Sequence, residues 1–396
     1  MTQDATQNFV FARGPRILFG PGSFQQLPDL LRQYGRRVLF VTGRASYRQG
    51  ERWDRLLEAL AARQMEAVRV EVQGEPSPQL VDEAVAHYRS GGFEVVAAIG
   101  GGGTLDAGKA IAAMLTVDGA TEEYLEEIGS RAHPGTRLPL VAIPTTAGTG
   151  SEATKNAVLS RIGPQGYKRS LRHDNFVPDL ALIDPELMVS CPPDLTAACG
   201  LDALTQLLEA YVSTKASPLT DALTFSGLLH FKESFPAVCG EGATNVAMRG
   251  ALAYAALLSG LTLANAGLGV IHGLAGPLGG FFAIPHGVAC GTLLGAATGV
   301  NIHALLHREA GDKTALAKYA MAGHLLSGRE PEDIHQGCDF LIGQLNDWID
   351  ELQIPRLGAF GIEETDFEKI VAAADNKNNP VRLEQEDWRN ILKLRL

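Results

Sequence analysis

The hydrophobic pattern of the chain changes character at the proline pair Pro192-Pro193. Before this point, short β-rich runs alternate with amphipathic helical stretches, which is typical of a parallel sheet with helical crossovers. After it, long apolar-periodic segments follow one another with hardly a strand signal, and Asp194 is a plausible N-cap for the first of them. The pattern predicts an α/β domain over residues 1–190 and an all-helical domain over 191–396, and 396 residues are enough for two domains.

The elements of both domains can be located along the chain. Strands are expected at residues 37–42, 67–72, 94–99, 138–143 and 179–183, with helices at 53–62 and 78–88 among them. The second domain is expected to hold helices at about 194–213, 218–234, 243–265, 287–299 and 313–327. A cleft between the two domains is the expected ligand site.

Four consecutive glycines, at 100–103, follow the third expected strand in the sequence EVVAAIGGGGTLDAGKAIAA. Glycines between a strand and a helix leave backbone amides bare, so that these amides and the helix dipole can both point at a pyrophosphate. The spacing differs from the GxGxxG pattern, because Leu105 stands where the third glycine would be. A tight turn at a strand end is the alternative interpretation.

A second loop, in LPLVAIPTTAGTGSE, also follows an apolar strand. It offers hydroxyl groups among its glycines, from Thr145, Thr146, Thr149 and Ser151. Two donor-rich loops at adjacent strand ends favour a dinucleotide over a simple turn at each place.

Three side chains of the helical half are candidate metal ligands. Asp202 lies four residues before Gln206 in GLDALTQLLEAYVS, so both can lie on one helix face. His272 and His286 follow in HGLAGPLGG and IPHG. One carboxylate and two imidazoles suit zinc or ferrous iron with an open coordination position, which would lower the pKa of a substrate oxygen. The alternative is that these side chains only make local hydrogen bonds.

The charge balance excludes some partners. Lys and Arg number 34 and Asp and Glu 45, and a net charge of −11 would repel nucleic acid and anionic membranes. The five cysteines include no CxxC pair, which favours a reducing cytoplasm. No signal peptide or membrane span is expected, and the apolar run nearest to a span, 251–270, is interpreted as a buried helix.

An ordered set of sequence blocks resembles the iron-containing alcohol dehydrogenase family. The blocks are GGGGTLDAGKAIA, PTTAGTGSEAT, GLDALTQLLEAYVS, NAGLGVIHGLAGPLGG and IPHG, with RILFGPGS near the start and NKNNPVRL near the end. The resemblance implies a nucleotide-binding α/β domain, a helical metal-binding domain, and a cofactor in the cleft. It further implies hydride transfer between NAD(P) and an alcohol or aldehyde, and a homodimer or larger homo-oligomer.

The resemblance also assigns site residues. The cofactor-binding set is expected to be Gly43, Gly101, Gly102, Gly103, Asp106, Lys109, Thr145, Thr146, Thr149 and Ser151. The metal ligands are expected to be Asp202, His272 and His286, which are also the catalytic candidates, with Gln206 as a doubtful fourth ligand.

Three positions depart from the family pattern. Gly103 replaces a serine, and backbone amides can still serve there. Gln206 replaces a histidine, and its amide oxygen is a poorer ligand for iron or zinc. Gly276 replaces a histidine of many members and leaves room for a bulkier substrate. Relatives with one Asp and two His ligands use zinc, and other relatives use no metal. Without a metal in this chain, a protonated His272, His286 or Lys168 would have to stabilise the substrate oxyanion.

The cofactor has one specificity signal, in VTGRAS. An acidic residue after the first strand would bind the adenosine ribose and repel a 2′-phosphate, but Gly43 stands there with Arg44 and Ser46 beside it. The sequence therefore favours NADP(H), unless these residues only form a turn.

Other functions remain open on the sequence alone. The first is a metal-independent reductase of the same fold, similar to maleylacetate reductase. The second is a phosphate-substrate cyclase or lyase of the related superfamily, which the lack of a basic cluster near Asp202 and His272 disfavours. The third is a protein that binds NAD(P) without catalysis.

Overall fold

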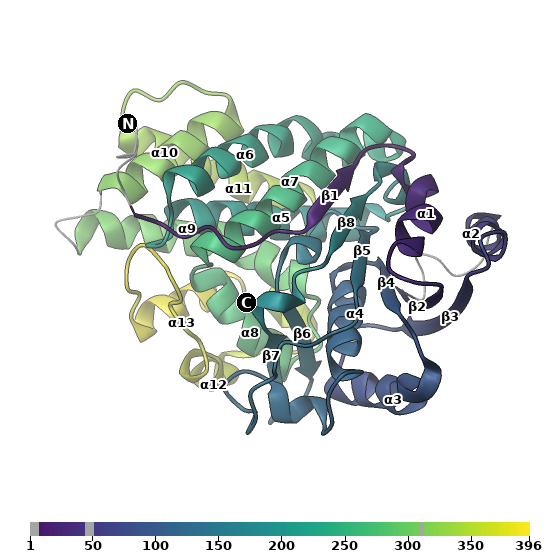
Figure 1. The fold of residues 1–396 in the computed structure, drawn as a ribbon. Helices are drawn as coiled ribbons and strands as arrows, with labels where there is room; N and C mark the ends of the chain where they lie inside the picture. The colour runs from purple at the N-terminus through teal and green to yellow at the C-terminus, as the bar shows by residue number, and fades with distance from the viewer. Residues whose placement is uncertain (1–7, 44–50, 309–312) are drawn as a thin grey trace.

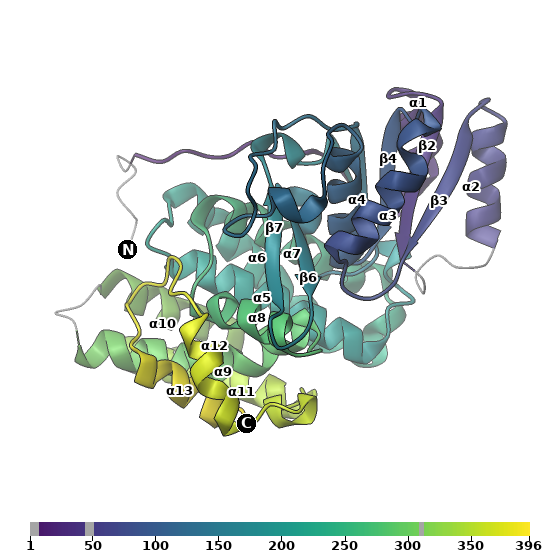
Figure 2. The same cartoon turned by 90° about the horizontal axis from the view of Figure 1, so that it is seen from below.

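The computed structural model describes residues 8–43, 51–308 and 313–396. A six-stranded sheet with its helices lies on one side of the molecule and a group of long helices on the other (Figures 1 and 2). The described strands pair in the order β1-β8-β5-β4-β2-β3, and all of these pairs are parallel. The predicted fold class, a parallel α/β domain followed by a helical domain, is confirmed.

The strands of the sheet are β1 (Arg16–Phe19), β2 (Arg37–Gly43), β3 (Glu66–Val72), β4 (Val95–Gly100), β5 (Leu140–Pro144) and β8 (Leu180–Ile183). Every residue of the two central strands, β4 and β5, is buried. Parallel strands covered on both faces read as continuous apolar runs, which is why VVAAIG and LVAIP fill the centre.

Helices cover both faces of the sheet. Along β4, the side chains of Val96 and Ala98 pack with α3 (Pro78–Tyr88) and α4 (Gly102–Met114). The alternate residues of the strand pack with α1 (Leu27–Arg32) and α2 (Glu51–Ala61). This alternation follows from the two-residue period of a strand and produces two apolar layers.

A two-stranded antiparallel sheet, β6 (Asn156–Arg161) with β7 (Tyr167–Arg172), lies outside the main sheet. It packs against α4 of the first domain and against α8 (Val270–Phe281) of the second. The sequence analysis did not predict this hairpin, nor the short edge strand β1. Both consist of few residues, and β1 depends on pairing with β8, which is distant in the chain.

The helical domain is built around α5 (Pro193–Val212), which contacts α6 (Pro218–Val238), α7 (Val246–Ala266) and α9 (His286–His307). The remaining α-helices are α10 (Lys313–Ser327), α11 (Ile334–Glu351), α12 (Phe367–Ala372) and α13 (Gln385–Leu394). Nearly all of α5 is buried, so polar residues on it face other protein groups rather than water.

The segment before β1, residues 8–15, contacts the helical domain before it enters the sheet. It runs along the helices toward the sheet (Figure 1), and the amide of Ala12 donates a hydrogen bond to Oδ1 of Asn265 on α7.

The boundary between the domains lies between β8 and α5. Because β8 ends at Ile183 and α5 begins at Pro193, the change of architecture falls in the interval that contains the predicted boundary. The exact division at residue 190 stays a prediction.

The sequence pattern predicts Asp194 as the N-cap of α5, but the structure places Asp194 elsewhere. Pro192 holds that position and the helix begins at Pro193, with Asp194 in its first turn. Proline suits the first position of a helix because its fixed φ is already helical and its missing N–H has no partner to lose there. The carboxylate of Asp194 still lies at the positive end of the helix dipole.

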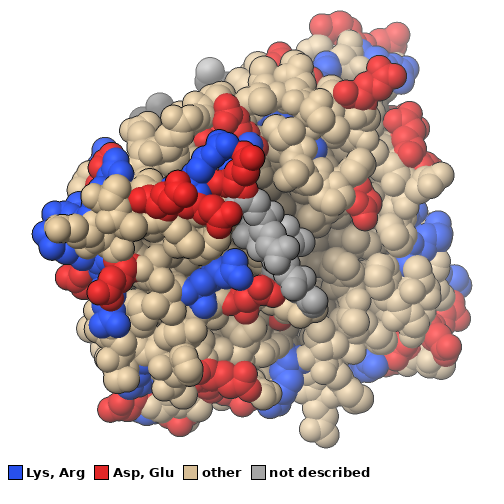
Figure 3. Space-filling model, turned by 90° about the vertical axis from the view of Figure 1, so that its right-hand side faces the viewer, with Lys and Arg blue, Asp and Glu red and all other residues tan. Residues whose placement is uncertain are grey.

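Two described helices, α7 and α9, are long and apolar enough to cross a membrane by length and composition alone. Both pack against α5, and most of each apolar window is buried inside the protein, as in core helices. The face of the molecule in Figure 3 carries Lys and Arg interspersed with Asp and Glu rather than in one continuous basic patch.

Candidate functional site

The glycine-rich loop joins β4 to α4 at the carboxyl edge of the sheet. Gly101 occupies the N-cap position of α4, and no side chain caps that end of the helix. A Cβ atom at Gly102 would lie 2.5 Å from side-chain atoms of Thr149, and one at Gly101 would lie 3.3 Å from Oγ1 of Thr146. Gly102 is therefore required for the two loops to approach, Gly101 leaves little room for a side chain, and the expected proximity of these loops is observed.

A single cavity of about 880 Å³ begins at these loops and extends to the helical domain. Its wall includes seven of the residues predicted to bind the cofactor: Gly43, Gly101, Gly102, Gly103, Thr145, Thr146 and Thr149. Asp202 and His286 belong to the same wall. The cavity is large enough for a small organic ligand, and it brings the two predicted half-sites together.

Three other predicted cofactor residues lie beneath the cavity wall. Nζ of Lys109, which is fully buried, lies 3.3 Å from Oδ1 of Asp106 and 2.7 Å from Oγ of Ser151. It also lies 3.1 Å from Oγ1 of Thr154 and 2.6 Å from the carbonyl oxygen of Asn156. This network connects α4 with the loop that contains Ser151. These side chains therefore support the wall of the cavity rather than facing into it.

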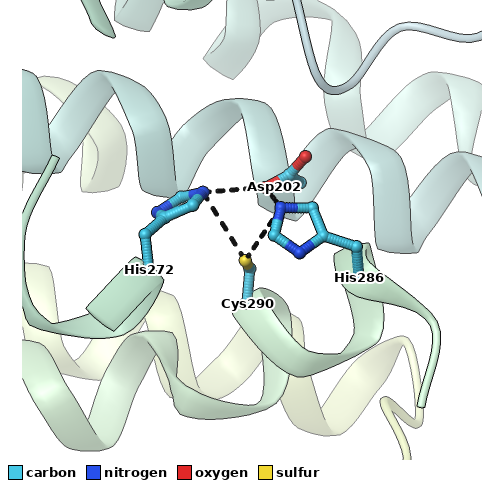
Figure 4. Close-up of side chains that lie close together, drawn as sticks. All are labelled: Asp202, His272, His286 and Cys290. Atoms are coloured by element: carbon cyan, nitrogen blue, oxygen red, sulfur yellow. Dashed lines mark hydrogen bonds and ion pairs between the residues drawn. The ribbon is translucent and has the colours of Figure 1, made fainter. Parts of the chain in front are cut away.

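The candidate metal cluster is formed by Asp202 on α5, His272 on α8, and His286 and Cys290 on α9 (Figure 4). Oδ1 of Asp202 lies 3.4 Å from Nε2 of His272 and 3.7 Å from Nε2 of His286. Sγ of Cys290 lies 3.7 Å and 3.8 Å from the same two nitrogens. All four potential ligand atoms lie within 4.8 Å of one another.

The polar atoms of the cluster fit a divalent cation. Oδ1 of Asp202 is buried, and no described group donates a hydrogen bond to it. A buried acceptor without a partner costs about 1–3 kcal/mol, and more when it is charged. The oxygen points at two imidazole nitrogens and a thiol sulfur, which are all metal-ligating atoms, and a shared cation would satisfy it.

The electrostatics of the cluster also favour a cation. Burial raises the pKa of Asp202, but the attraction of His286 and His272 outweighs it and brings the pKa to about 2. Burial, together with the positive charge of Lys168, lowers the pKa of His286 to about 4. Burial opposes protonation of His272 too, yet Cys290 and Glu209 raise its pKa above the usual value. Asp202 and His286 are thus in the forms that bind metal, and the surroundings of His272 attract positive charge.

Gln206 lies behind the cluster. Its Nε2 donates to Oδ2 of Asp202 at 3.0 Å, and its Oε1 accepts a hydrogen bond from Ser259 at 2.6 Å. Because a carboxylate only accepts hydrogen bonds, the amide nitrogen must face Asp202, and the amide oxygen must face away. In this arrangement Gln206 supports Asp202 and its amide oxygen is turned away from the cluster, and the assignment of Gln206 as a fourth ligand stays a prediction.

Glu209 completes the polar face of α5, and the sequence analysis missed it. Its Oε2 accepts a hydrogen bond from Nδ1 of His272 at 2.7 Å, and its Oε1 accepts one from the amide of Ile271 at 2.6 Å. A carboxylate on one ring nitrogen fixes the imidazole tautomer and directs the other nitrogen to the metal. The spacing of residues 202, 206 and 209, one turn apart on one helix, was the signal that could have revealed it.

Cys290 was also missed, because the cysteines were considered only as CxxC pairs. It lies four residues after His286 on α9, so that both side chains project from one helix face (Figure 4).

Lys168 on β7 lies beside the cavity. Its Nζ is 3.1 Å from Oε2 of Glu75, which belongs to the cavity wall. Its positive charge adds to the effect of burial in lowering the pKa of His286. The role of Lys168 near a substrate oxygen stays a prediction. A Cβ atom at Gly276 would meet nothing within 4 Å, so the space expected at this position exists.

Comparison with known proteins identifies the relatives of this chain. Residues 14–185 match the family described as iron-containing alcohol dehydrogenase, and residues 196–396 match the C-terminal domain of the same family. The chain is 34% identical over 368 residues to long-chain-alcohol dehydrogenase 1 of Geobacillus thermodenitrificans, which covers 91% of this chain and 90% of that protein. It is 32% identical over 280 residues to the NAD-dependent methanol dehydrogenase of Bacillus methanolicus, or 69% of this chain and 71% of that protein.

A solved structure agrees with these sequence matches. The crystal structure of a 1,3-propanediol oxidoreductase superimposes with a TM-score of 0.86 at 28% identity, covering 98% of this chain and 100% of that one. The chain therefore belongs to the iron-containing alcohol dehydrogenase family and is an oxidoreductase that interconverts alcohols with aldehydes or ketones.

Proposed function

We propose that hydride transfer takes place where the glycine-rich loops and the Asp202 cluster face the same cavity. The observation that carries the proposal is the single 880 Å³ cavity, whose wall includes Gly101, Thr149, Asp202 and His286. A pyrophosphate at the N-terminus of α4 would direct the nicotinamide toward the cluster. The substrate oxygen would lie at the cluster, with its reacting carbon against the nicotinamide ring.

A divalent metal at Asp202, His272 and His286 would act as a Lewis acid toward the substrate oxygen. The protein groups supply the remaining functions. Glu209 holds His272 with Nε2 directed to the cluster, and Gln206 holds Asp202 from behind. Burial, together with the charge of Lys168, keeps His286 neutral by lowering its pKa, and Lys168 would add positive charge where an oxyanion forms. Oxidation of the alcohol releases one hydride to the nicotinamide and one proton to solvent.

The pocket is proposed to accept bulky alcohols. The open space at Gly276, one helical turn after His272 on α8, supports this, because a histidine there would occupy space close to the cluster. Measurement of kcat/KM for a series of linear and branched alcohols would test the idea in the wild type and in Gly276→His. Equal losses for small and branched substrates in the variant would contradict it.

The second candidate function is a metal-independent reductase similar to maleylacetate reductase. The position of Gln206 favours it, since that side chain cannot complete the usual ligand set, and Lys168 and His286 could serve an oxyanion instead. A phosphate substrate is not favoured, because the described residues of the cavity wall include no Lys or Arg. Metal analysis of protein purified without chelators, with activity before and after EDTA, separates the first two functions.

The preferred nicotinamide cofactor is proposed to be NADP(H), with NAD(H) also accepted. Gly43 ends β2 at the cavity wall, and a glycine at this position does not repel a 2′-phosphate as an acidic residue would. Arg44 and Ser46, the other residues of this prediction, lie outside the described residues. Steady-state kcat/KM values with NADH and NADPH in parallel would decide, and a preference for NADH would contradict the proposal.

The location and assembly are also proposals. A cytoplasmic location is supported by the five cysteines, all of which are free thiols. A homodimer or larger assembly is supported by β1, an edge strand that exposes Ile17 and Phe19. Light scattering during gel filtration would test the assembly, and a monomer across the working concentration range would contradict it.

The activity is tested by a screen of alcohols and aldehydes with NAD(P)+ and NAD(P)H, with and without added zinc or iron. Turnover that depends on added metal supports the metal-assisted function. Turnover that is complete without metal favours the second candidate.

A further inference from the structure

We propose that Cys290 is the fourth protein ligand of the metal, as a thiolate whose proton is released to solvent on metal binding, and that the site selects zinc over iron. The substrate oxygen would then join as a fifth ligand, as catalytic zinc sites allow. The inference rests on the proposed metal at Asp202, His272 and His286. It concerns this chain specifically, because the sequence resemblance leads to a histidine at position 206 and assigns no role to Cys290.

Four of the six distances among the ligand atoms have the lengths expected for the edges of a four-coordinate site, and the other two lie within 4.8 Å. With bonds of about 2.0–2.1 Å to nitrogen or oxygen and about 2.3 Å to sulfur, a tetrahedron has edges of about 3.4 Å between N and O and about 3.6 Å between N and S. The observed N to O distances are 3.4 Å and 3.7 Å, and the observed S to N distances are 3.7 Å and 3.8 Å. The two N to O contacts are long for hydrogen bonds, the two contacts of sulfur have the length of weak sulfur hydrogen bonds, and all four also have the lengths of the edges of a coordination sphere.

The helices hold these atoms in place without help from a ligand. Asp202 projects from α5, His272 from α8, and His286 and Cys290 from successive turns of α9. A Cβ at Gly287 would lie 2.6 Å from the carbonyl oxygen of Ala198 on α5, so the start of α9 packs directly on the helix that carries Asp202. The cluster is therefore assembled by three helices, and α9 packs against both of the others.

Gln206 leaves a coordination position that Cys290 can take. The amide oxygen of Gln206 is turned to Ser259, and a flip of the amide would place that oxygen against the carboxylate of Asp202. Cys290 approaches the same group of atoms from the opposite helix, α9 (Figure 4). The loss of a histidine on α5 is thus compensated by a thiol on α9.

The ligand chemistry then favours zinc. A thiolate is a soft ligand, and two imidazoles, a carboxylate and a thiolate form a set that suits Zn²⁺ and its probe Co²⁺. The carboxylate of Asp202 and the thiolate of Cys290 together balance the charge of a divalent ion at a site where Asp202, His272 and Cys290 are buried. Such a balance reduces the cost of holding the ion away from water.

The test is substitution with cobalt. Metal-free full-length protein is titrated with Co²⁺, and absorption is recorded in the visible range for d–d bands and in the near ultraviolet for thiolate-to-cobalt charge transfer. The expected result is one cobalt per chain with a charge-transfer band in the wild type. The band is expected to disappear in Cys290→Ala and to remain in Cys338→Ala, a matched control for another buried thiol, which contacts Leu316 away from the cluster.

The metal preference is tested on the same proteins. Competition of zinc and iron for the metal-free wild type is expected to favour zinc, and Cys290→Ala is expected to lose zinc affinity by more than about tenfold. Gln206→His would restore the nitrogen ligand and is expected to shift the preference toward iron. A wild type that binds iron more tightly than zinc would overturn the claim of selectivity.

Two outcomes separate this inference from the proposed function. Cobalt binding with d–d bands but no charge-transfer band, or with a band that persists in Cys290→Ala, refutes the role of Cys290 and leaves the metal in place. Failure of the wild type to bind cobalt or zinc refutes the metal itself. If Cys290→Ala does not fold, X-ray absorption of the zinc-loaded wild type decides, because one sulfur at about 2.3 Å is expected in the first shell.

Discussion

Glu209→Gln changes a residue that supports the metal ligand His272 and leaves the proposed ligands themselves unchanged. In the wild type, the two carboxylate oxygens accept hydrogen bonds from Nδ1 of His272 and from the amide of Ile271, at 2.7 Å and 2.6 Å. Glutamine has one acceptor oxygen, so its NH2 group must face one of these two donors. If it faces His272, the imidazole must exchange tautomers and place a proton on Nε2, the atom directed at the cluster.

The magnitude follows from these two contacts. Loss of the partner of a ligating histidine typically costs about 10- to 100-fold in metal affinity, which is about 1.4 to 2.8 kcal/mol. Removal of one of two hydrogen bonds to a charged group costs the metal-free protein about 2 kcal/mol of stability. The variant is therefore expected to bind zinc 10- to 100-fold more weakly and to unfold at lower urea concentration.

Zinc affinity is measured by competition with a chromophoric chelator, and stability by urea unfolding of the metal-free protein. Asp221→Asn is the matched control, because Asp221 is a carboxylate of the same domain that contacts Lys318 at 2.8 Å rather than the cluster. The control is expected to lose stability but not zinc affinity. If Glu209→Gln binds zinc as tightly as the wild type, the account of Glu209 is wrong.

Three further predictions concern the cofactor side of the cleft. Lys109→Met leaves Asp106 buried without its cation and is expected to cost about 3–5 kcal/mol in urea unfolding; an effect below 1 kcal/mol would contradict the network. Burial raises the pKa of Glu152 to about 7 from 4.5, despite the opposing charge of Lys109. The folded state therefore retains a proton that the unfolded chain releases, so stability should fall by up to about 3 kcal/mol between pH 4.5 and 7 and level off above. Glu152→Gln should abolish that slope, and an unchanged slope would refute the assignment. Gly102→Ala places a Cβ 2.5 Å from the side chain of Thr149 and is expected to weaken cofactor binding about tenfold or more, measured by nicotinamide fluorescence; an unaltered dissociation constant would show that the loops tolerate the methyl group.

The sheet and the cleft could be predicted from local pattern. Strands such as β4 are continuous apolar runs, and the glycines that follow them mark the edge where ligands bind. Asp202, His272 and His286 were predicted as a set and do converge. Their roles as ligands, like the roles of the predicted cofactor residues, stay predictions until binding is measured.

The missed residues depend on contacts between distant segments. Glu209 on α5 meets His272 through hydrogen bonds to the start of α8, about 60 residues later in the chain, and Cys290 meets His272 only because α9 packs against α8. The sequence motif also does not tell which side chains face the cavity: Lys109 and Ser151 belong to the cofactor-binding blocks, yet they point into the protein. β1 depends in the same way on β8, about 160 residues later in the chain.

The most direct test of the central claim is transfer of deuterium from a C1-deuterated alcohol to the nicotinamide ring, followed by mass spectrometry. Metal-free enzyme is compared with the same enzyme after stepwise addition of zinc. The account predicts little transfer without metal and recovery that saturates at one zinc per chain, with deuterium in the reduced cofactor. Full transfer by the metal-free enzyme would contradict a metal-assisted reaction at Asp202, His272 and His286.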